Sequence, residues 1–234
     1  MTVDATSQPG SAASTARRPS GIWRFVRRNV TLVIGLTILA IMLLVAILAP
    51  FFAGDALTMK PVQRLKPPSE AFWFGTDQLG RDVFARTLWG ARISLLVGLS
   101  VAALSVIIGL VIGLLAGTVR WVEAVVRRFM DGLMAIPSIL LAIAMVSLFG
   151  ASVLIVIIAI VIPEVPRVVR LVRAVVMATR EQPYVEAAVA GGAKWWKVLV
   201  RHILPPTIPP LIVQATYICA SAILVEAALS FLGA

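Results

Sequence analysis

The 234-residue sequence is short of the side chains on which most catalytic and metal sites depend, with one cysteine, Cys219, and one histidine, His202. A disulfide framework, a cysteine-rich metal site, a zinc site and a histidine-based nucleophile triad are therefore excluded. The sequence also lacks the Gly-x-x-x-x-Gly-Lys-Ser/Thr loop that binds nucleotide phosphates. We expect no catalytic residue, no metal site and no cofactor in this chain, and thus not an enzyme.

Charged residues are also scarce, at 14% of the chain, whereas 60% are hydrophobic and the mean hydropathy is +0.98. Such a composition exposes more apolar surface than a soluble domain can hide, and predicts an all-α protein of the lipid bilayer. The net charge of +10 comes from short basic clusters between apolar runs, which favours membrane topology over a nucleic acid partner. Residues 1–28 are expected to form a disordered tail without a cleaved signal.

Long charge-free runs predict five membrane-spanning helices. The first covers residues 29–53, an extracytoplasmic segment follows at 54–92, and the core domain covers 93–234, with its first span at 93–119. The run 132–163 is too long for one span, and the turn residues 149–152 divide it into two helices. The second of these must continue through Pro163, Pro166 and Arg167 to reach full length. The fifth span is expected to start after four prolines, at Leu211, and to end near Leu232.

The distribution of lysine and arginine between the loops indicates the orientation. One side holds five before Asn29, three in 120–128 and seven in 167–201, while the other holds six in 60–92. The N-terminus is therefore expected in the cytoplasm, and Ala234 on the outer side.

The longest polar segment on the predicted inner side, 181–206, has the pattern of two short helices. Pro183 suits a first helical turn, and Gly191 and Gly192 are expected to end the first helix. The second is expected over 194–203, stopped by Pro205 and Pro206.

The string Glu186-Ala187-Ala188, Gly192 and His202-Ile203-Leu204-Pro205 resembles the signature loop of ATP-binding cassette importer permeases. The resemblance implies a coupling helix that docks into a cleft of the ATPase subunit. It assigns docking to Tyr184, Glu186, Ala187, Ala188, Gly191, Gly192, Trp195, Trp196, His202 and Pro205. For His202 itself we expect local hydrogen bonding at the helix end.

A second string, 74–86 followed by 90–95, is similar to the outer segment before the second span in dipeptide, oligopeptide and nickel permeases of the C-type. Its motif residues are Gly75, Thr76, Asp77, Gly80, Arg81 and Asp82. From the residues alone, either aspartate can cap the next helix and Arg81 can pair with either. The resemblance implies the MetI-like transmembrane domain of a type I importer, in which a sixth helix normally follows the last span expected here.

The family also implies the partners. They are a second homologous permease, two ATP-binding subunits that hold ATP and magnesium, and an extracytoplasmic binding protein, assembled in the bacterial inner membrane. Peptides are the expected substrates, with nickel or another small solute as the alternative. A proton-coupled secondary carrier that uses Glu226, the acid within the fifth span, is the rival from another class.

Arg167, Arg170 and Arg173 recur every three residues, near one helix face at the predicted membrane boundary. We interpret them as side chains that reach lipid headgroups, with gating by Arg170 and Arg173 as the alternative. Glu226 is a candidate for the permeation path, and Asp131 is expected at the start of the third span.

Overall fold

The computed structural model describes residues 29–52, 54, 56 and 58–232, and divides the chain into two compact units, 1–44 and 45–234. The tail expected at 1–28, and Gly233 and Ala234, lie outside the described residues. The described regular structure is helical, apart from two isolated β-bridges.

Helix α2 (Val30–Phe52) corresponds closely to the first predicted span. Its 23 residues extend about 35 Å, enough to cross a hydrocarbon core of about 30 Å. The helix is apolar on every face, and Ala46 and Ala49 are its buried residues. Such a surface suits a lipid environment.

Helix α3 (Val83–Thr118) begins ten residues before the predicted start of the core at residue 93, so the last ten residues of the outer segment predicted at 54–92 are helical. The helix start is set by Asp82, whose carboxylate accepts a hydrogen bond from the backbone N–H of Phe84 at 2.9 Å. Arg86 and Arg92 lie within the helix, because a charge interrupts an apolar run without interrupting helical geometry. Before α3, the segment contains one short 3₁₀ turn, η1 (Pro61–Gln63).

Helices α4 (Arg120–Met134) and α5 (Ser138–Phe149) form a bent pair, with 79° between them. The segment 120–128, which was predicted to lie on the cytoplasmic side between two spans, is helical, since Val119 alone separates α3 from α4. The charged residues of α4 lie on one face of the helix and its apolar residues on the other. This pattern forms an amphipathic helix in a segment that the charge count had marked only as polar. Asp131 consequently lies in the last turns of α4, and not at a helix start.

Helix α6 (Val153–Arg180) follows the predicted turn at 149–152, and the side chain of Ser152 accepts a hydrogen bond from Ile155 N at 3.3 Å. The helix continues through Pro163 and Pro166, as predicted. By length and composition, α2, α3 and the helical run 195–231 can cross a membrane, and α4 with α5 can form a fourth, bent span. The fourth predicted span, which corresponds to α6, stays a prediction because Glu164, Arg167 and Arg170 fall within that helix.

The last elements are α7 (Pro183–Ala190), α8 (Trp195–Val198), the π-helical turn η2 (Leu199–Ile203) and α9 (Leu204–Phe231). The helix after Gly192 is not stopped by Pro205 and Pro206, and α9 starts seven residues before the predicted Leu211. Prolines are tolerated in the first turn of a helix, and the wider π turn before them changes the hydrogen-bond register. The loop predicted to end at residue 206 therefore merges into α9.

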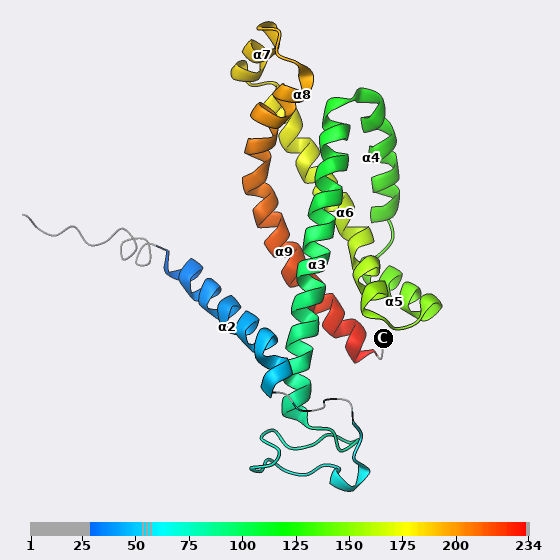
Figure 1. Ribbon diagram of the computed structural model, residues 1–234. Coiled ribbons are helices and arrows are strands. Elements are labelled where there is room, and N and C mark those ends of the chain that lie inside the picture. Colours follow the sequence, from blue (N-terminus) through cyan, green and yellow to red (C-terminus); the bar gives the residue numbers. More distant parts are fainter. Residues whose placement is uncertain (1–28, 53, 55, 57, 233–234) are drawn as a thin grey trace, which may run out of the picture. The chain divides into compact units, whose positions relative to one another are not determined.

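The core of the 45–234 unit is built where α3 packs against α6 and α9 (Figure 1). In the second half of α3 every fourth residue from Ser105 to Gly117 is small, and Gly109, Gly113 and Gly117 face Val168, Val172 and Val176 of α6. A β-carbon at these glycines would lie 2.5 to 2.6 Å from a valine side-chain carbon, so the backbones approach as closely as side chains allow. Small residues at four-residue spacing are typical of tightly packed membrane helices. We call this contact the α3–α6 seam.

Candidate functional site

In the 75–82 motif, the Asp77 carboxylate is a hub of hydrogen bonds. It accepts from the backbone N–H groups of Leu79 at 2.8 Å and Arg81 at 2.9 Å. The side chains of Arg81 and Arg86 donate to its other oxygen at 2.9 and 2.6 Å. Burial opposes ionisation of this carboxyl, but the hydrogen bonds outweigh it and hold the pKa of Asp77 well below its usual range. The predicted pairing of Arg81 with an aspartate is confirmed.

The other motif residues also find partners within the segment. The Thr76 hydroxyl donates to Gln63 O and accepts from Lys66 N at 2.8 Å. Gly80 has φ +74°, and a β-carbon there would overlap the carbonyl oxygen of Lys60. With Gly75 also at positive φ and Asp82 capping α3, the motif is a self-contained fold.

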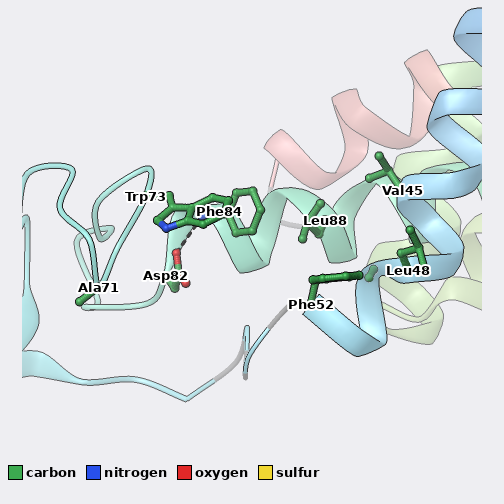
Figure 2. Close-up of a pocket in the computed structure, with 9 residues that line it drawn as sticks. Val45, Leu48, Phe52, Ala71, Trp73, Asp82, Phe84 and Leu88 are labelled. Carbon is green, nitrogen blue, oxygen red and sulfur yellow. Dashed lines mark hydrogen bonds between the residues drawn. The ribbon is translucent and has the colours of Figure 1, made fainter.

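A pocket of about 420 Å³ lies beside this motif (Figure 2). Trp73 and Phe84 form one wall, with ring centroids 5.0 Å apart, and Asp82 lies next to them. Leu88 and residues 45–52 provide apolar side chains on the other side. The pocket was not foreseen from the sequence, because its lining comes from three separate segments.

The 181–206 loop turns sharply after α7. Gly191 caps α7 and donates to Ala187 O at 2.9 Å, while Gly192 donates to Val189 O at 3.0 Å. Gly192 has φ +77°, a left-handed conformation that favours glycine. The helix end predicted at Gly191 and Gly192 is therefore a left-handed turn. The loop is anchored from below by the buried side chains of Val185, Val198 and Ile203.

Above these anchors the loop presents an exposed aromatic surface. Trp196 is 60% exposed, Tyr184 47% and Trp195 44%. Most of the predicted docking residues are exposed together on the loop; two, Ala188 and His202, are partly buried. Instead of the local hydrogen bond expected for His202, its ring faces Tyr184 at 6.2 Å between centroids.

Arg170 and Arg173 of α6 pair with acids of α4, and are not directed only to headgroups as the sequence suggested. Arg173 Nη2 lies 2.5 Å from Glu123 Oε1, and Arg170 Nη2 lies 2.9 Å from Asp131 Oδ1. Glu123 also pairs with Arg127 four residues later. Glu123 was not among the predicted site residues, although its i,i+4 spacing to Arg127 was a detectable signal.

Two acids lie within the apolar helices, Glu226 partly buried and Glu164 buried. Glu226 of α9 accepts a hydrogen bond from Ser94 Oγ of α3 at 2.8 Å, beside a pocket of about 270 Å³. Glu164 of α6, which was overlooked, is 4% exposed and pairs with Arg167 at 2.5 Å. Its other carboxylate oxygen has no hydrogen-bond partner among the described residues, nor has the buried Ser105 hydroxyl. Ser105 lies four residues before Gly109 of α3, and Glu164 lies four residues before Val168 of α6. Both therefore continue the four-residue repeat of the α3–α6 seam.

Comparison with known proteins places these features in a family. The family model described as "Binding-protein-dependent transport system inner membrane component" matches residues 105–234, more than half of the chain. The chain belongs to this family. A second family model, described as the N-terminal transmembrane domain of oligopeptide transport permease C, matches residues 20–68 of this chain.

Several relatives are similar over most of the permease. A probable peptide ABC transporter permease of Sinorhizobium fredii is 52% identical over 229 residues, covering 94% of this chain and 79% of the relative. A dipeptide transport system permease protein of Alkalihalophilus pseudofirmus is 41% identical over 239 residues, covering 100% and 78%. A probable D,D-dipeptide transport system permease protein of Escherichia coli is 41% identical over 198 residues, covering 84% and 66%.

Membership identifies the chain as a membrane protein and implies two kinds of partner, an ATPase and a substrate-binding protein. The 75–82 motif and the 181–206 loop lie at opposite ends of α3 (Figure 1). The two polar segments therefore lie beyond the two ends of this apolar helix.

Proposed function

We propose that this chain is the non-catalytic permease subunit of an ATP-driven peptide importer. Three relatives of 41 to 52% identity are named for peptide or dipeptide transport, which supports peptides as the substrate class. A second homologous permease would complete the translocation path. Two ATP-binding subunits would hold ATP and magnesium, and a binding protein would deliver peptide from the outer side.

The observation that carries the proposal is the geometry of the 181–206 loop. An exposed set of Tyr184, Trp195 and Trp196 stands on a buried base that continues without a break into α9. Exposed aromatic side chains are costly in water and are favoured as anchors at protein interfaces. A partner that binds them gains a rigid handle on α9, and on α6 through the short connection before α7.

The charge distribution supports the orientation in which this loop faces the cytoplasm, together with the N-terminus. ATP is then available on the same side as the loop. The 75–82 motif would face the binding protein, and closure of the ATPase dimer would drive alternating access across the membrane.

The direct test purifies the tagged permease, expressed with its neighbouring subunits, from membranes. We expect the ATPase subunits to be recovered with the wild type. Gly192→Pro should abolish both their recovery and peptide uptake, because proline cannot adopt φ +77° and has no N–H to donate to Val189 O. The matched control is Gly132→Ala, because Gly132 lies in α4 outside the loop and a β-carbon there meets open space.

Uptake is measured with a labelled dipeptide and, in parallel, with a nickel salt. Failure of the wild type to recover an ATPase, or unchanged recovery and uptake in Gly192→Pro, would refute the docking role. Uptake of nickel without peptide would replace the substrate class.

A further inference from the structure

Arg180, the last residue of α6, contacts two other helices, α3 and α8, and was not among the predicted site residues. Its Nη1 donates to the carbonyl oxygen of Gly117 at 2.9 Å. Its guanidinium carbon lies 5.6 Å from the ring centroid of Trp195, in α8. One side chain therefore joins the ends of α3 and α6 to the 181–206 loop.

The hydrogen bond from Arg180 gives the carbonyl oxygen of Gly117 a partner that α3 itself does not supply. Gly117 lies in the last turn of α3, where carbonyl oxygens have no partner further along the helix. Gly117 also ends the α3–α6 seam, since its β-carbon position lies 2.6 Å from Val176. Arg180 thus holds the seam at the point where the chain leaves α3 for α4.

Among the described residues, the hydrogen bond of Arg180 is the side-chain link between the 181–206 loop side of the structure and the turn between α3 and α4. A pocket of about 390 Å³ separates α7 from the turn between α3 and α4, lined among others by Arg120, Glu123 and Glu186. Among the hydrogen bonds and ion pairs of the described residues, the Arg180 bond alone joins residues 176–206 to the turn at 117–120. The stacking on Trp195 adds the attraction between a cation and an aromatic face.

We propose that Arg180 is a positioning residue that fastens the 181–206 loop to the α3–α4 turn. The proposal rests on the docking function proposed for the loop. When the partner moves the loop, Trp195 moves with it. The guanidinium passes that displacement to the end of α3 and so to α4, in addition to the direct path through α6 and α9.

The α4 end of this path is held by charges. Glu123, one turn beyond Val119, is bound by Arg173 of α6. Arg180 and Arg173 therefore hold the α3–α4 turn at two points, the first responsive to the loop and the second internal to the helix pair. Loss of Arg180 would leave the turn attached to α6 but no longer to α8.

The test uses the complete transporter in proteoliposomes and measures peptide imported per ATP hydrolysed, together with recovery of the ATPase subunits. Arg180→Ala should leave recovery unchanged and lower the ratio about tenfold, the effect of losing one charged hydrogen bond and one cation–π contact. Arg180→Lys, which keeps a cation and a donor, should restore part of the ratio. Arg128→Ala is the matched control, since Arg128 is an exposed arginine of α4 outside this contact.

A second pair of variants separates transmission from folding. Arg180→Gln keeps an N–H donor for Gly117 O but loses the attraction to the ring, and Trp195→Leu loses the ring itself. Each should lower the ratio, and the double variant should be no worse than the poorer single one, because both remove the same contact.

An unchanged ratio in Arg180→Gln, or a fully additive double variant, would overturn the proposal. So would a ratio in Arg180→Ala equal to that of Arg128→Ala. If the wild type itself recovers no ATPase, the docking function has failed, and that result is distinct from a failure of Arg180 alone.

Discussion

In the 75–82 motif, the side chains of Thr76, Asp77, Arg81 and Asp82 all have partners nearby, whereas the 181–206 loop leaves its largest side chains exposed. Asp77 accepts four hydrogen bonds from within residues 79–86, and the space around Gly80 is filled by backbone. Around Gly192 there is nothing within 4 Å of a β-carbon, and Trp196 is 60% exposed. Both segments stood out in the sequence as motifs that resemble those of known permeases. The first is packed against its own backbone, whereas the second exposes its aromatic side chains.

The largest expected effect is at Gly80. Gly80→Ala should destabilise the 58–82 segment by about 4 kcal/mol, because it combines a strained φ of +74° with an overlap on Lys60 O. Protease cleavage within this segment, followed in detergent, measures the change. Gly90→Ala is the control, since open space surrounds Gly90. Equal protection in both variants would show that the motif is not tightly folded.

The exposed surface should behave in the opposite way. Trp196→Ala should weaken ATPase binding by about 2 kcal/mol, or roughly thirtyfold, while the thermal stability of the isolated permease stays unchanged. Titration of the purified ATPase against reconstituted permease gives the dissociation constant. A loss of stability without a loss of binding would mean that Trp196 supports the fold instead.

Asp77→Asn tests whether charge contributes to the 75–82 motif. The substitution should cost about 1.5 kcal/mol, since two arginines lose an ionised acceptor. The pKa of Asp77 is lowered by folding, so the contribution is present above the unfolded value, about pH 4, and is lost as the pH falls below it. Proteolytic protection of the wild type should therefore decrease below this pH, and that of Asp77→Asn should depend less on pH.

Gly192→Ala should give the smallest effect, about 1 kcal/mol, because its φ of +77° is strained for alanine but its surroundings are empty. Gly191→Ala should be nearly neutral. Thermal unfolding of the two variants in detergent compares them directly. A cost at Gly192 as large as at Gly80 would mean that the loop is already packed without its partner.

The sequence was sufficient for features set by local rules. The α5–α6 turn, the cap by Asp82 and the end of α7 at Gly191 each depend on residues within a few positions of one another. It was misleading where charge counting replaced helical geometry, as at α4, whose charges lie on one face of a helix. The start of α9 was misplaced because a π turn, which has no clear signature in the residues, precedes the prolines.

The candidate site was predictable only in its residues and not in its contacts. The aromatic surface of the loop follows from a resemblance that names Trp195 and Trp196, but their exposure depends on where Val185 and Val198 are buried. Arg180 and Glu123 each have one partner, Gly117 and Arg173 respectively, that is 50 or more residues away in the chain. Such pairs depend on how the helices pack, which a single sequence does not specify.

The α3–α6 seam limits how this permease can change shape. Its steps repeat every four residues, so a sliding helix meets the next fitting position only after about 6 Å, and any smaller shift drives valine into backbone. The two helices can therefore keep their register or shift by a whole four-residue step, but they cannot pack at intermediate positions. Smooth rearrangement has to take place elsewhere, and the break at Ala135–Pro137 between α4 and α5 offers a place for it.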